Sequence, residues 1–421
     1  MAVVAPPRRQ GLVTLSSAEA RDRSIRRRVG ITWALLYFNT LTYTSGSILH
    51  IPSHVGKGIA QAALPLALVV ALTVNPKIRL RPNVFLCLMC LLAVDTVLTA
   101  VQVHAPGTAF RTFRLIEFVA ALWLLTPWWG RRDLLLLRYH LRCLYVTLGV
   151  VLVGIPLSPG RAFAFAGRLS GIIWTMTPTQ VAQYAGVAAG LTIILWLTRC
   201  LGGRIALLGV TLCIVLLLLT HTRTALVSLG AGVLIAGLSL FHVNARVRRF
   251  FAAGVAVVSI AIVTAAGVLT TWLARGQSTQ GLLTLTGRTN FWALVLNTPR
   301  DRIQEIFGFG LSNASVNGLP IDSNWLAAYM QEGLFGVTIC ALILLFLLVY
   351  AFFQAPSQRA ALALFILVYC LVDSFTEDAF TDVSTYLLHL TIAASLLAVV
   401  PLTRRDRSQA IAPFPDGTVQ W

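Results

Sequence analysis

Four arginines lie in polar segments that share one face of the predicted protein, and their side chains could bind a phosphate. They are Arg161, Arg168, Arg223 and Arg288. A guanidinium is permanently charged and presents a fixed fork of donors, which suits the oxygens of a pyrophosphate. Arg223 is the sharpest case, because it follows His221 in a very short turn between two apolar segments. The alternative is an interfacial arginine that extends to the lipid headgroups.

Other charges lie inside apolar segments, where a charged side chain costs at least about 2.5–3.5 kcal/mol. Asp95 is in the third apolar segment, and Arg111, Arg114 and Glu117 begin the fourth. The spacing of three places the last three on neighbouring positions of one helix face. Either they form a structural pair, Asp95 with Arg114 or Arg114 with Glu117, or they line a polar cavity.

Carboxylates and amides gather in the longest polar interval, residues 287–336, and in an acidic turn that follows. They include Asp322, Asn324 and Glu332, with Asp378 in the turn. A carboxylate can act as general base toward a hydroxyl group. The simpler interpretation for Glu332 is a charge that favours a helix N-terminus, and for Asp378 it is a solvated loop.

The composition shows which elements must position these side chains. Of 421 residues, 57% are apolar and only 11% are charged, and the mean hydropathy is +0.79. A soluble domain has about 25% charged residues, so we predict an all-α polytopic membrane protein that contacts the lipid bilayer directly. The formal net charge of +18 fits arginines at cytoplasmic loop ends, so no nucleic-acid partner is expected.

About twelve apolar segments are each near the ~20 residues that a bilayer requires. With the N-terminus inside, most of the 33 Lys and Arg residues fall on the cytoplasmic side, so both termini are expected there. The other face then receives residues 158–180, 221–223, 274–324 and 373–382. The predicted segments are 31–49, 58–74, 84–101, 112–127, 141–157, 181–198, 205–220, 224–240, 250–273, 325–351, 359–374 and 383–401.

This topology divides the chain into five parts. A cytoplasmic basic tail (1–30) precedes nine transmembrane helices (31–273), a long extracytoplasmic loop (274–324), three more helices (325–401) and a cytoplasmic tail (402–421). A structureless loop of about fifty residues is uncommon, so we predict short helices at 289–296 and 300–307 and a turn at Phe307–Gly310.

The seven cysteines fall in or beside apolar runs and form no metal-ligand or disulfide framework, so no metal or cofactor is expected. Cys87 and Cys90 have CxxC spacing, but they lie within an apolar span, where small core-packing residues are the better interpretation. The first apolar run follows about thirty polar residues and lacks a cleavage site, and we expect it to remain as a membrane anchor.

Several short motifs occur in a characteristic order between residues 160 and 340. They are Gly167-Arg-Leu-Ser-Gly171 with Thr177-Pro-Thr-Gln180, Thr222-Arg-Thr224, Gly287-Arg288 with Phe307-Gly-Phe-Gly310, and Asp322-Ser-Asn-Trp-Leu326 with Glu332-Gly-Leu-Phe-Gly336. With these motifs the chain resembles the O-antigen ligase and O-antigen polymerase superfamily of bacterial envelope glycosyltransferases. It departs from the family in two places: it has Thr-Pro-Thr where the family has an Asn-Pro-Asn-type element, and Ser323-Asn324 where many ligases have His-Asn.

The resemblance implies a GT-C-like arrangement and metal-independent transfer from a polyprenyl-pyrophosphate-linked glycan at the outer face of the bacterial cytoplasmic membrane. The acceptor would be a glycan or a lipid, and both ligase and polymerase remain possible. The arginines would bind the pyrophosphate. Asp322 is the ionisable group nearest to the missing histidine, which makes Asp322 and Asn324 the expected catalytic residues.

Two other function classes remain open. A transporter or flippase of a polar or lipid-linked substrate would show two similar halves and broken helices near the midplane. The sequence shows no obvious repeat, and its polar residues concentrate at one face. A non-catalytic scaffold is the third possibility, and the set of outer arginines argues mildly against it.

Overall fold

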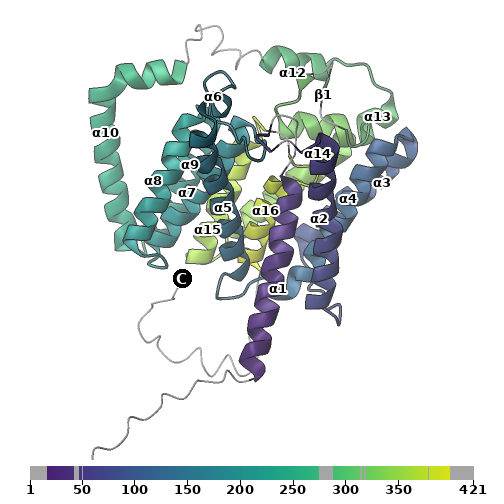
Figure 1. Ribbon diagram of the computed structural model, residues 1–421, viewed down its shortest axis with the longest axis horizontal. Helices are drawn as coiled ribbons and strands as arrows, with labels where there is room; N and C mark the ends of the chain where they lie inside the picture. Colours follow the sequence, from purple (N-terminus) through teal and green to yellow (C-terminus); the bar gives the residue numbers. More distant parts are fainter. Residues whose placement is uncertain are drawn as a thin grey trace, which may run out of the picture.

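The computed structural model describes residues 17–41, 47–49, 51–274, 288–312, 315–316, 319–377 and 379–398. It is a bundle of long helices that run up and down along a common direction, with short elements gathered at one end (Figure 1). This confirms the predicted all-helical class. A single antiparallel pair of two-residue strands, β1 (Ser315–Val316) and β2 (Leu319–Pro320), is the described part's other regular structure.

The long helices coincide in position with the twelve predicted apolar segments. The largest difference is at the start of the first helix, which continues through the arginine-rich residues before position 31. The helices are α1 (Ser17–Thr40), α2 (Ser53–Val74), α3 (Val84–Val103), α4 (Pro106–Leu125), α5 (Leu135–Leu157), α7 (Pro178–Leu197), α8 (Gly203–Leu219), α9 (Arg223–Phe241), α10 (Ala245–Ala274), α14 (Asn324–Phe352), α15 (Gln358–Asp373) and α16 (Thr385–Leu397).

Within the described residues, six helices are both long and apolar enough to cross a membrane: α2, α3, α5, α7, α9 and α14. Helices α8 and α16 are apolar but shorter. The charged first half of helix α1 is held by ion pairs. Arg26 donates to Asp22 on the same helix at 2.6 Å and to Asp133, after α4, at 2.8 Å.

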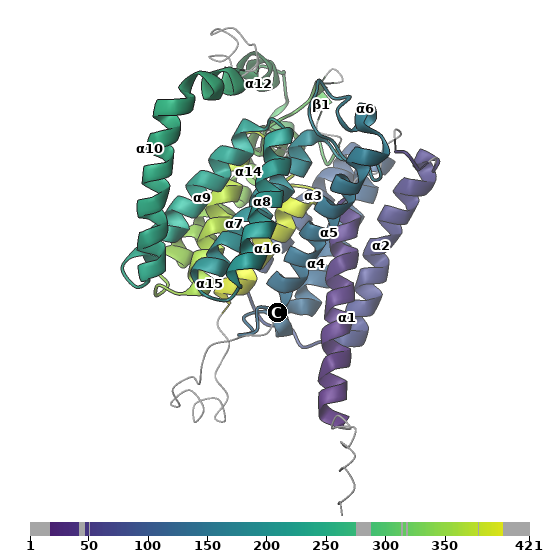
Figure 2. The same ribbon diagram turned by 60° about the vertical axis from the view of Figure 1, so that its left-hand side comes forward.

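The residues at either end of helix α16 identify the two ends of the bundle. Ala398, just after it, borders a cavity together with Arg26 and Arg359, whereas Thr385, its first residue, borders another cavity with Asp322. We call these the lower and the upper end, as they appear in Figure 1. The start of α1 and the end of α16 therefore lie at the same, lower end. In Figure 2, α10 stands at the edge of the bundle.

The core forms where α15 lies against α7. Gly186 and Gly190 are four residues apart on α7, and Tyr369 and Phe365 of α15 pack on them. Small residues at this spacing let two helices approach closely in a membrane. Gly232 of α9 also lies close to the Phe365 ring.

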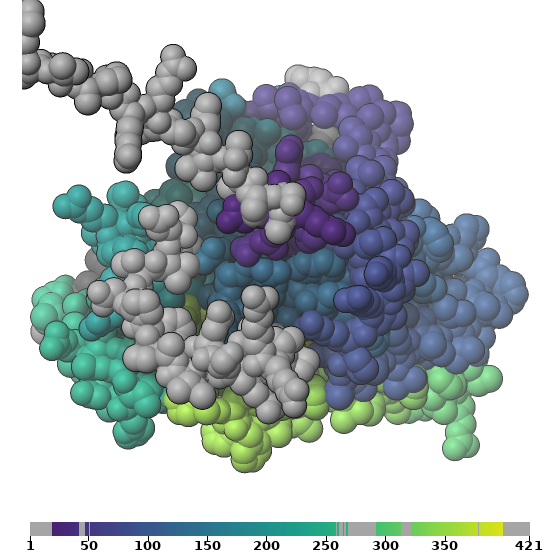
Figure 3. Space-filling model, turned by 90° about the horizontal axis from the view of Figure 1, so that it is seen from below, coloured from purple at the N-terminus to yellow at the C-terminus, as the bar shows by residue number. Residues whose placement is uncertain are grey.

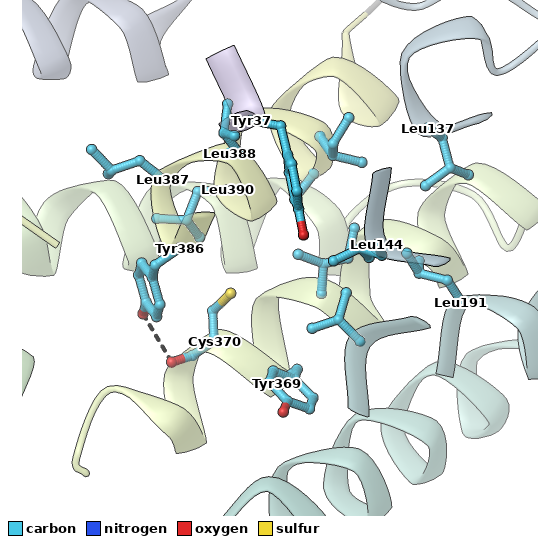
Figure 4. Close-up of a cluster of buried hydrophobic side chains, with 14 of the residues drawn as sticks. Tyr37, Leu137, Leu144, Leu191, Tyr369, Cys370, Tyr386, Leu387, Leu388 and Leu390 are labelled. Carbon is cyan, nitrogen blue, oxygen red and sulfur yellow. Dashed lines mark hydrogen bonds between the residues drawn. The ribbon is translucent and has the colours of Figure 1, made fainter. Parts of the chain in front are cut away.

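Figure 4 shows Tyr369 in this buried region, with Tyr386 of α16 donating its hydroxyl hydrogen to the Cys370 carbonyl at 2.8 Å. The figure also shows Tyr37 of α1 and Leu191 of α7 around the same cluster. Side chains from these four helices thus meet at the centre of the bundle, where the Tyr386 hydroxyl has a hydrogen-bond acceptor.

The upper end carries the predicted short elements. Helix α12 (Arg288–Leu296) and helix α13 (Arg302–Phe307) confirm the expectation of two short helices in this interval. Asp301 caps α13 by accepting from the Gln304 backbone N–H at 2.7 Å, as Asp does at a helix N-cap. A third short helix, α6 (Pro159–Ala162), and a 3₁₀ turn, η1 (Thr126–Trp128), complete the helical elements of the described chain.

Helix α14 is broken at Gly333, and the break docks the turn after α13. Gly333 has φ 62° and ψ −160°, a conformation that glycine adopts without the steric cost of a Cβ. The break leaves two carbonyls free for new partners. Phe309 N donates to Met330 O at 2.9 Å, and Gly310 N donates to Gln331 O at 2.8 Å.

We predict that Gly190→Ala destabilises the protein, because its new Cβ would overlap the Phe365 ring, which Gly232 of α9 also approaches closely. Overpacking of this kind costs about 1–3 kcal/mol. Gly230→Ala on α9 is the matched control, since a Cβ there meets no atom within 4 Å. Thermal unfolding in detergent should show a lower midpoint for Gly190→Ala alone. Equal midpoints for the two variants would contradict this packing.

Candidate functional site

A polar cavity of about 400 Å³ lies at the upper end of the bundle. Its walls come from α1, α4, α7, α14, α16 and the segments around Asp322 and Asp382. It is lined mainly by hydroxyls, amides, carboxylates and one arginine, together with two alanines and a valine: Thr40, Arg111, Thr177, Thr179, Gln180, Gln183, Tyr184, Ser312, Asp322, Ala327, Gln331, Glu377, Ala379, Thr381, Asp382, Val383, Ser384, Thr385 and Tyr386. Such a surface can bind a ligand rich in hydroxyl groups.

Gln331 holds three walls of this cavity together. Its side-chain amide donates to Ser312 O at 3.1 Å and accepts from the Thr381 hydroxyl at 2.5 Å. Its backbone carbonyl accepts from Gly310 because α14 is broken two residues later. The break at Gly333 therefore positions the turn at 308–312 and, through Gln331, the segment around Thr381.

Asp322, the predicted general base, lines the cavity just before α14 begins. Its neighbour Asn324 has a different position. Asn324 is 2% exposed, its side-chain oxygen accepts from Ala379 N, and its backbone N–H donates to Ser374 O at 2.9 Å. Asn324 thus holds the segment after α15 in place through these two hydrogen bonds. It does not itself line the cavity.

An ion pair of Arg111 and Asp382 crosses the cavity wall with an N–O distance of 2.7 Å. The pair joins α4 to the segment before α16, two parts of the chain that are 271 residues apart. Both side chains are about one-quarter exposed, so the pair is screened less than a surface pair would be. It places a guanidinium beside the same space that Asp322 borders.

Hydroxyl groups form one side of the cavity at the meeting point of α1, α7 and α16. Thr385 lies between Thr40 and Tyr184, with oxygen–oxygen distances of 2.8 and 3.0 Å. Gln183, also on α7, donates to the Asp373 carboxylate at 2.9 Å. Tyr184 and Tyr386 lie behind this side of the cavity, where they are 2% and 0% exposed.

The Thr177-Pro-Thr-Gln180 motif forms the start of α7 and a further part of the cavity wall. Thr177 Oγ1 accepts from Gln180 N at 3.3 Å, and the Gln180 side chain accepts from Thr177 N at 3.2 Å. This is a capping box, with Pro178 at the first helical position. The motif therefore fixes where α7 begins and presents Thr179 and Gln180 to the cavity.

Two of the predicted phosphate-binding arginines meet at one turn. Arg168 donates through Nε to Thr220 O at 2.9 Å and through Nη2 to Thr222 Oγ1 at 3.0 Å. Arg223 follows immediately as the first residue of α9, and His221 occupies the turn with φ 51°. The segment that carries Arg168 also leads to Thr177, so one connection links this turn to the cavity.

The predicted phosphate-binding arginines do not line this cavity. This holds for Arg168 and Arg223, and also for Arg161, which lies exposed on the short helix α6. Arg288 begins α12, and its side chain falls outside the described residues. Asp378 also lies outside the described part of the chain.

One of the two interpretations, a close ion pair of Arg114 with Asp95 or Glu117, does not hold. Within the described residues, Arg114 donates to the Asn39 side chain at 3.2 Å, and its charge acts on Glu117 without a contact of ion-pair length. Asp95 is fully buried on α3, and its carboxylate has no hydrogen-bond partner in the described part of the structure. The reason is packing: α4 presents Arg114 to α1, and α3 presents Asp95 to α14.

Glu332 is the residue that Asp95 approaches. It is also fully buried, and the two carboxyl groups are close enough for their charges to interact. Glu332 is followed directly by the break at Gly333 and packs against Gly336. Both acids lie outside the set of residues that border the cavity. Half-buried Glu117 likewise lies outside it.

Sequence reasoning missed several side chains that border the cavity. Arg111 borders the cavity, in line with the interpretation that its group of charges lines a polar cavity, whereas Gln183, Gln331 and Tyr184 carry no motif that separates them from ordinary helix residues. The two glutamines could have been found only as polar residues within apolar helices. That they meet at one cavity depends on how α7, α14 and α16 pack.

Comparison with known proteins adds no relative. No protein-family model matches the chain, and no curated protein matches it.

Proposed function

We propose that this protein is a membrane glycosyltransferase that transfers or polymerises glycan from a polyprenyl-pyrophosphate donor onto a glycan or lipid acceptor. The observation that carries the proposal is the position of Asp322 in a polar cavity at the same end of the bundle as the turn that joins Arg168 and Arg223. Asp322 can take up a proton, and the arginines at the turn can bind a leaving pyrophosphate.

The proposed membrane arrangement follows from the two ends of the bundle. Twelve helices cross the bacterial cytoplasmic membrane in a GT-C-like arrangement. The lower end faces the cytoplasm, because it holds both ends of the described chain and several arginines. The upper end then faces outward, with α12 and α13 in the extracytoplasmic loop.

The turn at 220–223 is the proposed site of the donor's pyrophosphate. Arg168 already orders this turn, and Arg223 stands at the N-terminus of α9, a helix of 19 residues. Backbone N–H groups and the dipole at such an N-terminus favour an anion. Arg288 is the third proposed ligand, and Arg161 the fourth. Their positive charge would stabilise the charge that develops on the leaving group.

The polar cavity is the proposed site of the acceptor. Asp322 accepts the proton of an acceptor hydroxyl while that oxygen attacks the anomeric carbon of the donor. The bond between this carbon and the pyrophosphate oxygen breaks, and its electron pair leaves with the pyrophosphate. Gln183 and Gln331 would orient hydroxyl groups.

We predict that Asp322→Asn lowers the rate of glycan transfer by about 100-fold or more, because the amide cannot take up the proton. The measurement is transfer by the purified protein from a polyprenyl-pyrophosphate-linked glycan to its acceptor in detergent. Glu305→Gln removes an exposed carboxylate from α13, outside the cavity, and should leave the rate unchanged. Full activity in a folded Asp322→Asn protein would rule out this base.

We also predict that Arg223→Ala lowers transfer by about 100- to 1000-fold, the usual loss when one charge-stabilising donor is removed. Arg302→Ala is the matched control, since Arg302 is exposed on α13. Unfolding temperatures of both variants test whether they fold. The pyrophosphate site is wrong if folded Arg223→Ala and Arg288→Ala proteins both retain full activity.

The same preparation separates the proposal from a transporter. Reconstituted in vesicles, a transporter or flippase would move the lipid-linked glycan between leaflets without forming a new glycosidic bond. A glycosyltransferase forms that bond in detergent, where no second compartment exists.

A further inference from the structure

The lower end of the bundle contains a second cavity, of about 800 Å³, that the proposed glycan transfer does not use. Figure 3 views the molecule from this end. Five arginines and a single aspartate line the cavity: Arg26, Arg81, Arg131, Arg132, Arg359 and Asp133. The balance of charge strongly favours an anion, and arginine forks suit the oxygens of a phosphate.

The cavity has a fixed frame. Arg359 donates to Gly130 O at 2.9 Å and to Ala398 O at 3.0 Å, which ties the segment after α4 to the end of α16. Arg26 and Arg131 both contact the one aspartate, Asp133, at 2.8 and 3.4 Å. These residues hold the wall in place.

Donors remain available on this frame. Arg81 and Arg132 are exposed and form no ion pair with another described residue. The buried Nε–H of Arg359 has no acceptor within the described structure. The charge of the lining therefore exceeds what Asp133 can neutralise, and a phosphate would supply the missing acceptors.

An apolar groove of about 340 Å³ continues from this cavity. The two spaces share Arg81, Trp129, Leu397 and Ala398, so a ligand can occupy both. The groove runs between α3, α14 and α16, and its far wall contains Val84, Phe346, Leu347 and Tyr350. Val84 is 49% exposed and Tyr350 is 37% exposed, which places the rim of the groove on the surface that membrane lipid would cover.

We propose that the lower end binds an anionic phospholipid, with its phosphate headgroup in the arginine cavity and an acyl chain in the adjoining groove. Basic pockets between transmembrane helices on the cytoplasmic side bind such headgroups in other membrane proteins. A free phosphate would use the arginines alone and leave the groove empty. This site is separate from the proposed glycan transfer at the upper end and does not depend on it.

The test measures binding of dioleoyl phosphatidylglycerol, dioleoyl phosphatidylcholine and inorganic phosphate to the delipidated full-length protein by native mass spectrometry and thermal shift. Phosphatidylglycerol should bind at least about tenfold more tightly than phosphatidylcholine. The double variant Arg81→Gln/Arg132→Gln should lose about tenfold or more of this affinity, since hydrogen bonds to a charged group are removed. The double variant Arg204→Gln/Arg249→Gln removes two exposed arginines outside the cavity and should change it less than twofold.

A third variant tests the groove. Val84→Trp would fill it and should weaken phosphatidylglycerol binding while the arginines remain intact. Unchanged phosphatidylglycerol binding in either Arg81→Gln/Arg132→Gln or Val84→Trp would overturn the proposal. Inorganic phosphate that binds as tightly as phosphatidylglycerol would also overturn it, because the source would then be a free anion.

Discussion

The architecture of the upper end depends on one interruption of a helix. Helix α14 breaks at Gly333, and the carbonyls of Met330 and Gln331 become acceptors for the turn at 309–310. A side chain at Gly308 or Gly333 would overlap the backbone of the other segment. Two glycines thus allow two backbones to touch. Through Gln331, the same break orients Ser312 and Thr381, and with them the wall of the polar cavity.

The arginines at the two ends of the molecule make different contacts. At the lower end, arginines such as Arg359 surround a cavity and bind carbonyl groups at the ends of helices. At the upper end, Arg168 orders the turn that precedes α9, and Arg111 pairs with Asp382 across a cavity wall. In the proposed orientation the upper end faces outward, where arginine opposes the usual bias. The proposed glycosyl transfer gives the upper arginines a task that topology alone would not.

The elements were predictable from the sequence, because a segment of about 20 apolar residues and a glycine or proline at its border are local signals. The short helices α12 and α13 and the glycine turn at 307–310 were found in this way. The partner of a side chain was not predictable from local signals. Arg114 was expected to bind Asp95 or Glu117, yet it contacts Asn39 on α1. Arg111 and Asp382, 271 residues apart, meet only because α4 and the segment before α16 pack at the same end. Asp322 borders the polar cavity, whereas Asn324, two positions later, is buried and accepts a hydrogen bond from Ala379 N.

The central claim is that the donor's pyrophosphate binds at the upper turn and that its glycan enters the cavity beside Asp322. The most direct measurement is a structure of the protein with a bound polyprenyl-pyrophosphate glycan. The account predicts pyrophosphate density next to Arg223 and Arg168, with the first sugar directed toward Asp322. Pyrophosphate density among Arg81, Arg132 and Arg359 at the lower end, with the upper turn empty, would contradict it.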